Sequence, residues 1–236
     1  MIDGAEMKNL AIRLLAVAIA VAVMTQLRKP WGWLGRLMLW RMNWSHDALT
    51  DWGLTYVAID PRCAALDVGC GGGRTVQKLA KSARDGTVVG LDYSSTSVAE
   101  SRRTNAPAIA DGRVEIRKGS VSSLPFDDRT FDLVTAVETH YYWPDLVANL
   151  REILRVLRPG GTVAIVAEAC RTSRLGWLHW LAMKPIGGDV LSADEHRDRL
   201  VEAGYSEVEI HHDEEHGWIC ALARAPASTS STRPSS

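Results

Sequence analysis

The chain has 236 residues and a formal net charge of -1, with 46% hydrophobic and 23% charged residues. This length suits one catalytic-sized domain with an appendage, and the composition is that of a globular protein, which excludes collagen-like, mucin-like and largely disordered chains. The near-neutral charge balance provides no basic field to hold a phosphate backbone, so we expect no nucleic-acid partner.

Residues 1–29 are interpreted as a hydrophobic N-terminal segment. Residues 10–27 are apolar apart from three positions, and a helix over them would be about 27 Å long, close to the hydrocarbon thickness of a bilayer. A membrane-spanning anchor, an interfacial helix and a soluble helix packed on the domain all fit this pattern, whereas Asp3 and Glu6 argue against a signal peptide. More basic residues follow the segment than precede it, which predicts that an anchored domain faces the cytoplasm.

Residues 30–60 are expected to form amphipathic helices that cap the domain. Five of the nine tryptophans lie between Trp31 and Trp52, and those in residues 30–44 stand beside basic residues, as in a helix at a membrane interface. The alternative is a helix that covers the core of the domain. Membrane contact over residues 10–44 is therefore expected only if these helices lie at a membrane. Residues 225–236 are small and polar, which predicts a disordered tail.

Short apolar runs alternate with helical patterns in the domain that we place at residues 61–224. We expect strands at residues 64–68, 87–91, 114–117, 131–137 and 162–166. We expect helices at residues 74–84, 95–105, 144–157 and 192–204, the third of them stopped by the Pro-Gly-Gly at residues 159–161. An antiparallel pair of strands at residues 205–211 and 218–223 completes the domain. This alternation predicts an α/β fold, with a parallel sheet covered by helices on both faces and ligands bound at the carboxyl ends of its strands.

The most informative run joins the first strand to the first helix and reads D-V-G-C-G-G-G-R from Asp67 to Arg74. Its glycines let the backbone approach a ligand closely, and the helix that follows offers unpaired N–H groups. A dinucleotide fingerprint would need glycine where Arg74 stands, and the Gly-Lys-Ser/Thr ending of a phosphate-binding loop is missing. An oxidoreductase is therefore disfavoured.

This run resembles the D-x-G-x-G-x-G first motif of class I S-adenosylmethionine-dependent methyltransferases. The second strand ends in Asp92, whose carboxylate can accept hydrogen bonds from both ribose hydroxyls. Residues 117–134 and 154–161 resemble the family's adenine-binding turn and the approach to its fifth strand. The resemblance extends over residues 44–223, and it implies a Rossmann-like, seven-stranded, mostly parallel sheet with one antiparallel strand, preceded here by the hydrophobic N-terminal helix.

The resemblance implies S-adenosylmethionine as the cofactor, and it implies which positions contact it. These are Asp67, Gly69, Cys70 and Gly71 around the methionine moiety, Asp92 at the ribose, Tyr93 at an adenine face, and Ser120 and Val121 at the adenine edge. Glu138 is a further candidate, for the amino group of the cofactor. Ser120 stands where the family often has aspartate, so we expect weaker but intact recognition of adenine.

Candidates for catalysis lie before the first strand and after the fourth. His46 is the leading candidate for a general base or an acceptor-orienting residue, unless Ser45 only caps a helix and His46 lies on the surface. Glu138 and His140 are the other candidates. The expected acceptor contacts are Asn43, His46, Tyr141, Tyr142 and Trp143, whose rings suit an apolar or cationic group. No metal site is expected, and residues 169–191 are expected to form a lid, a membrane-touching patch or core packing.

The resemblance implies methyl transfer from S-adenosylmethionine to a small-molecule acceptor, which is hydrophobic or membrane-associated if the N-terminal segment anchors the chain. The alternative is a non-catalytic S-adenosylmethionine-binding protein with a regulatory or scaffold role. The four cysteines include no C-x-x-C pair and are interpreted as reduced thiols. We therefore expect the domain in the cytoplasm or at the inner face of the cytoplasmic membrane.

Overall fold

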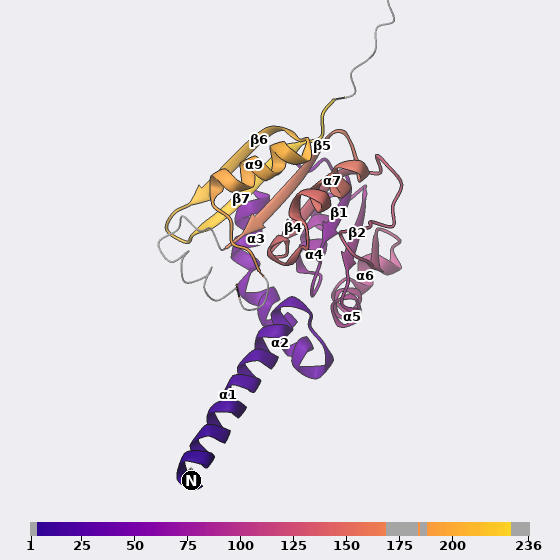
Figure 1. Cartoon of the computed structure of the whole chain (residues 1–236). Coiled ribbons are helices and arrows are strands. Elements are labelled where there is room, and N and C mark those ends of the chain that lie inside the picture. The colour runs from indigo at the N-terminus through magenta and orange to yellow at the C-terminus, as the bar shows by residue number, and fades with distance from the viewer. Residues whose placement is uncertain (1–3, 169–183, 185–187, 228–236) are drawn as a thin grey trace, which may run out of the picture.

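The computed structural model describes residues 4–168, 184 and 188–227 (Figure 1). Its seven strands form one sheet in the order β3-β2-β1-β4-β5-β7-β6. They are β1 (Ala64–Val68), β2 (Thr87–Asp92), β3 (Val114–Lys118), β4 (Phe131–Val137), β5 (Leu157–Ala167), β6 (Ser206–Asp213) and β7 (Trp218–Arg224). Among these strands β7 is antiparallel to both of its neighbours and the other pairs are parallel, which confirms the expected sheet.

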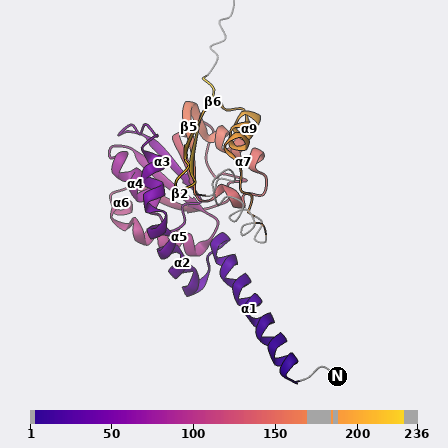
Figure 2. The same ribbon diagram turned by 90° about the vertical axis from the view of Figure 1, so that its left-hand side faces the viewer.

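Helices cover both faces of the sheet, as Figure 2 shows nearly edge-on. They are α3 (Asp47–Leu54), α4 (Arg74–Ser82), α5 (Ser95–Thr104), α6 (Ala106–Ala110), α7 (Leu146–Val156) and α9 (Ala193–Ala203). The buried side chains of α7 and α9 form one apolar core with one face of the sheet, and those of α3, α4 and α5 form a second core with the other face. The strands are apolar on both sides because both faces are covered.

The helix α7 ends within one residue of its predicted end, whereas β5 begins earlier than predicted. The helix stops at Val156, before the Pro-Gly-Gly, and β5 begins at Leu157. Leu157 pairs with Phe131 and Thr162 pairs with Leu133, so residues 158–161 form an irregularity inside the strand. Strand pairing therefore begins directly after the helix, and Gly160 supplies the positive φ of 78° that the turn at residues 158–161 requires.

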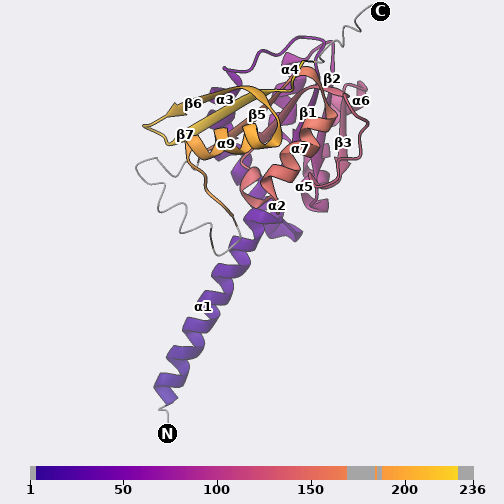
Figure 3. The same ribbon diagram turned by 45° about the horizontal axis from the view of Figure 1, so that its top comes forward.

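Two helices precede the domain, α1 (Gly4–Arg28) and α2 (Gly32–Ser45). All three ribbon views show α1 leaving the body of the molecule as a single projecting rod, whereas α2 lies against it (Figure 3). A tight turn joins them, in which the Trp31 amide donates to Gln26 Oε1 at 2.8 Å. Gly35 is required here, because a Cβ at this position would lie 2.8 Å from the carbonyl carbon of Pro30.

The structure describes the N-terminal helix, but only a small part of the linker and of the C-terminal tail. Within those residues, none of the helices has both the length and the apolar character needed to cross a bilayer, so the transmembrane helix is not supported. Most of the linker 169–191, most of the tail 225–236, and Cys170 lie outside the described residues. Cys63, Cys70 and Cys220 are free thiols, as expected.

Candidate active site

A cavity of about 250 Å³ opens at the carboxyl ends of β1, β2 and β4, where α2 covers the sheet edge. This is the place where parallel α/β sheets bind their ligands. Its wall includes most of the residues that the sequence singled out. They are Asn43, His46, Gly69, Cys70, Gly71, Asp92, Tyr93, Ser120, Val121, Glu138, Tyr142 and Trp143.

The glycine-rich turn after β1 forms the floor of the cavity. Gly69 and Gly71 have φ values of 76° and 50°, which other residues rarely adopt. A Cβ on Gly69 would lie 2.1 Å from Thr139 Oγ1, whereas a Cβ on Gly71 would meet nothing closer than a Leu39 methyl carbon at 3.7 Å. Gly69 is therefore fixed by packing against the β4 turn, and Gly71 presents bare backbone toward the cavity.

Asp92 ends β2 beside this turn and is 6% exposed. Its Oδ1 accepts a hydrogen bond from the Ser94 amide at 2.8 Å, and its Oδ2 accepts one from the Gly71 amide at 3.0 Å. Burial raises the pKa of this carboxyl, although those amide donors oppose the shift. The carboxylate thus ties the second strand to the glycine turn at the cavity wall.

Asp67, Tyr141 and His140 do not reach the cavity wall among the described residues. Thr135 Oγ1 donates to Asp67 Oδ1 at 2.7 Å inside the sheet, and burial raises the pKa of Asp67 to about 7. His140 is buried with its Nε2 only 3.1 Å from Nε2 of His196 on α9, and burial lowers its pKa well below the usual value. The sequence predicts His140 as a catalytic residue and Tyr141 as an acceptor contact, but each is only 3% exposed and neither is among the residues described as lining the cavity.

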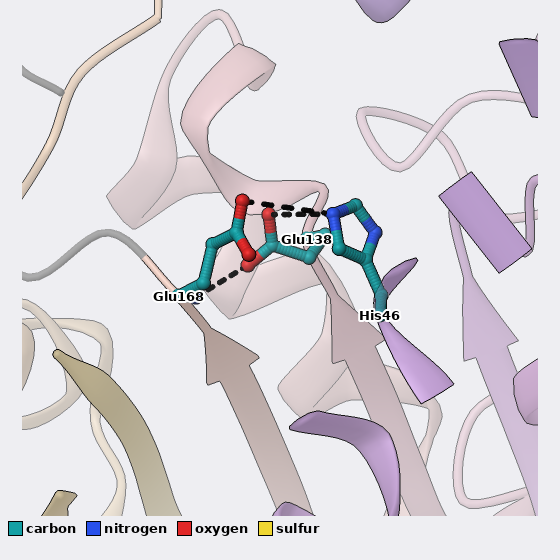
Figure 4. A group of neighbouring side chains, drawn as sticks. All are labelled: His46, Glu138 and Glu168. Carbon is teal, nitrogen blue, oxygen red and sulfur yellow. Dashed lines mark hydrogen bonds and ion pairs between the residues drawn. The ribbon is translucent and has the colours of Figure 1, made fainter. Parts of the chain in front are cut away.

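A cluster of His46, Glu138 and Glu168 stands at the cavity (Figure 4), and we call it the His46 cluster. His46 Nε2 lies 3.6 Å from Glu168 Oε1 and 4.0 Å from Glu138 Oε2. Glu138 Oε1 accepts hydrogen bonds from the Glu168 amide at 2.5 Å and from the Tyr141 hydroxyl at 3.0 Å. Glu138 also has a φ of 56°, a strained value that these hydrogen bonds hold in place.

The electrostatic environment of the His46 cluster favours the protonated form of the His46 imidazole. Burial of His46 lowers its pKa, but the hydrogen bond to Glu168 and the charges of Glu138 and Glu168 outweigh this, so its pKa is raised overall. Burial raises the pKa of Glu138 to about 7; the charge of His46 opposes this shift and that of Glu168 adds to it. A carboxyl with a pKa of about 7 therefore stands beside an imidazole with a raised pKa, which is the property expected of an acid–base site.

The position of His46 is fixed by the start of α3. The next residue, Asp47, accepts hydrogen bonds from Arg74 Nε at 2.7 Å and from Arg74 Nη2 at 3.1 Å, and Lys78 Nζ lies 2.7 Å from its Oδ1. Both partners belong to α4, the helix that follows the glycine turn. Asp47 thereby holds His46 next to the turn, and the guanidinium of Arg74 lowers the pKa of Asp47 below its usual range.

Sequence reasoning missed Glu168, which lies beside His46, and it missed Arg28 and Pro30, which line the cavity. A signal for Glu168 exists, because it is the first acid after the strand expected at residues 162–166 and so stands at the same sheet edge as Asp92 and Glu138. Arg28 and Pro30 could not be found in this way. They belong to the α1–α2 turn, and no local pattern shows that this turn folds back on the domain.

The ligand atoms of the His46 cluster all lie within 4.8 Å of one another, so a metal ion fits its donor set. Without a metal, Glu138 Oε1 already accepts two hydrogen bonds, one from the Glu168 amide and one from the Tyr141 hydroxyl. If the cluster works as an acid–base site, a chelator will leave turnover unchanged. Dialysis against EDTA followed by an activity assay checks this, and loss of activity that Mn²⁺ or Mg²⁺ restores would show that the cluster is a metal site.

Comparisons with known proteins agree with this geometry. Residues 66–165 match the family model described as a methyltransferase domain. Over these residues the chain is similar to methyltransferase domains. The matched residues run from β1 to β5, so the domain's glycine turn, Asp92 and Glu138 all lie inside the match.

Two relatives and one solved structure illustrate the likeness of the methyltransferase domain. The chain is 36% identical over 143 residues to demethylmenaquinone methyltransferase of Roseiflexus castenholzii, covering 58% of each chain. It is 36% identical over 121 residues to fatty-acid O-methyltransferase of Mycolicibacterium smegmatis, covering 51% of this chain and 43% of that one. The chain thus spans about half the length of these curated relatives. Human N-acetylserotonin methyltransferase in complex with SAM has a similar fold, with a TM-score of 0.70 at 15% identity over 82% of this chain and 56% of that chain.

Proposed function

We propose that the chain binds S-adenosylmethionine in the cavity and transfers its methyl group to a small-molecule acceptor. The observation that carries this proposal is the meeting of the bare Gly71 backbone and the Asp92 carboxylate at one cavity wall inside a methyltransferase domain. When bound, the cofactor supplies an electrophilic methyl group on a sulfonium sulfur. The protein then has to hold the donor, align the acceptor and exclude water.

The cavity wall suits the parts of this cofactor. The Gly69–Gly71 backbone, which carries no side chain at Gly71, faces the place where the methionine moiety would lie. Asp92 would accept hydrogen bonds from the ribose hydroxyls, and Tyr93, Ser120 and Val121 surround the space left for adenine. Cys70 contributes its backbone rather than its thiol, whose Sγ donates to Ser101 Oγ at 3.7 Å and whose pKa is raised by burial.

His46 is the group that we assign to proton removal from the acceptor, at Nε2. Nε2 lies 3.6 Å from Glu168 Oε1 and 4.0 Å from Glu138 Oε2, and the ring lines the cavity in which an acceptor hydroxyl would bind. Once Nε2 carries the proton, Glu168 and Glu138 stabilise the imidazolium that forms. Tyr142 and Trp143 line the same cavity and offer apolar surface to the body of the acceptor.

The pH dependence of turnover follows from this assignment. His46 accepts a proton only when neutral, and its pKa lies above the ordinary value of about 6.5, so kcat should rise as the pH rises past that higher pKa. The substitution Glu168→Gln removes the partner that favours the charged imidazole, so it should move this rise to lower pH. Profiles of kcat against pH check the shift. Glu115→Gln, a change at an exposed carboxylate bonded to Arg117, is the matched control; a Glu168→Gln profile equal to that of the wild type would contradict the assignment.

We propose further that the acceptor is a hydrophobic molecule and that the domain works at the cytoplasmic face of a membrane. Relatives named for demethylmenaquinone and for fatty acids support a hydrophobic acceptor, as do the aromatic residues of the cavity. The basic residues that follow the hydrophobic N-terminal segment support the cytoplasmic side.

An acceptor screen tests the proposed function. The full chain is incubated with methyl-labelled S-adenosylmethionine and with quinols, phenols, fatty acids, thiols or amines, and label in the organic extract is counted. We expect label to move into a hydroxyl-bearing hydrophobic acceptor. Tight cofactor binding with no transfer to any of these classes would instead support the non-catalytic scaffold protein.

A further inference from the structure

The outer side of α2 carries a continuous apolar stripe that the methyltransferase domain leaves uncovered. Trp33, Leu37, Trp40 and Trp44 recur at helical spacing and expose 72%, 53%, 64% and 78% of their surface. We call these four residues the tryptophan face. Exposed apolar patches of this kind mark interaction sites, because a monomer in water gains nothing from them.

The inner side of the same helix belongs to the cavity. Leu39, Met42 and Asn43 line the cavity wall, and Leu39 is 2% exposed. The start of α2 is held by the Ser94 hydroxyl, which donates to the Pro30 carbonyl at 2.7 Å, and by the Tyr93 hydroxyl, which donates to the Arg28 carbonyl. One helix thickness therefore separates the tryptophan face from the cavity.

Charge indicates what covers the tryptophan face. From Met7 to His46 the sequence has no aspartate or glutamate, and its basic residues are Lys8, Arg13, Arg28, Lys29, Arg36 and Arg41, in a chain whose formal net charge is -1. A second copy of this face would bring like charges together. An anionic lipid surface would complement them, and tryptophan beside arginine is the composition of helices at that interface.

The projecting helix α1 extends the same kind of surface. Met7, Leu10, Ile12, Leu14 and Leu15 are each more than half exposed, and they lie on several sides of the helix. All three ribbon views show that α1 leaves the molecule from the end where α2 lies (Figure 1). The helices α1 and α2 therefore expose apolar side chains at the same end of the molecule.

We infer that α2 is an interfacial helix whose tryptophan face docks on an anionic lipid bilayer, next to the cofactor cavity. This deepens the membrane part of the proposed function, and it rests on that function only for the chemistry of the cavity. A hydrophobic acceptor dissolved in the bilayer would then be separated from the cavity by one helix. Docking itself needs neither cofactor nor acceptor.

Quenching of tryptophan fluorescence by brominated lipids tests the docking in the full chain. We expect phosphatidylglycerol vesicles with brominated acyl chains to quench the wild type. The triple substitution Trp33→Phe, Trp40→Phe and Trp44→Phe keeps the face apolar, so it should keep vesicle binding and lose most of the quenching. Trp218→Phe, which changes a tryptophan of β7 packed against Trp52, lies outside α2 and should leave the quenching unchanged.

The charge part of the inference has its own variant. Arg36→Gln with Arg41→Gln should lower the partition coefficient onto anionic vesicles by about tenfold or more and leave the weaker binding to phosphatidylcholine vesicles unchanged. The control pair is Arg62→Gln with Arg84→Gln, at exposed arginines outside the segment. Three results would overturn the inference: no binding to vesicles, full quenching in the triple variant, or a dimer in sedimentation that the triple variant abolishes. None of them bears on methyl transfer, which the acceptor screen tests separately.

Discussion

Replacing His46 by alanine should lower kcat by about 10²–10⁴-fold, the usual contribution of a positioned general base. The reason is that His46 Nε2 is the cavity atom that the adjacent Glu168 and Glu138 prepare to receive a proton. The affinity for S-adenosylmethionine should change little, since His46 belongs to the acceptor side of the cavity. Steady-state kinetics with an acceptor found in the screen, together with calorimetry of cofactor binding, measures the two effects separately.

A control at another histidine sharpens the test of His46. His216 pairs with Asp213 on the turn between β6 and β7, and His216→Ala should keep full activity. If His46→Ala keeps kcat within a few-fold of the wild type, His46 is not the base. The acceptor would then be a group that reacts without losing a proton during attack, such as a thiolate or a free amine.

Replacing Asp92 by asparagine should weaken binding of S-adenosylmethionine by about 1.5–3 kcal/mol, or about ten- to 150-fold in Kd, because charge-assisted hydrogen bonds to the ribose hydroxyls are lost. The Asp92→Asn change keeps the shape of the side chain, and it keeps one oxygen that can accept a hydrogen bond from Gly71 or Ser94. Titration calorimetry gives the change in affinity.

The fold of the Asp92 variant has to be checked apart from its binding, since this carboxylate also ties β2 to the glycine turn. Thermal unfolding followed by circular dichroism gives that check, and Asp85→Asn, at an exposed carboxylate beside Arg84, is the matched control. An Asp92→Asn variant that is folded and binds the cofactor as tightly as the wild type would mean that the ribose lies elsewhere.

Sequence patterns predict the sheet well and the start of β5 poorly, for one physical reason. The strands at residues 64–68 and 131–137 have the expected bounds because their apolar runs end at turn residues. The Pro-Gly-Gly at residues 159–161 is a strong local stop signal, but Leu157 already pairs with Phe131 across the sheet. A contact between distant residues overrides the local signal there.

The candidate site also contains residues that sequence patterns predict and a residue whose contacts they do not predict. Gly71, Asp92 and Glu138 could be predicted from strand ends alone, because parallel strands bring their carboxyl ends to one edge. The contacts of His140 could not be predicted in this way. His140 follows the same strand as Glu138, yet its side chain contacts His196 on α9 and does not face the cavity. The direction of a side chain after a strand depends on the backbone of the turn, and here Glu138 has an unusual positive φ.

Titration calorimetry of the full chain with S-adenosylmethionine tests the central claim most directly, namely that the cavity between the glycine turn and Asp92 is a cofactor site. We predict binding of one cofactor per chain, competition by S-adenosylhomocysteine and no heat with NAD. A folded chain that gives no heat with S-adenosylmethionine, or that binds NAD in its place, would contradict the account.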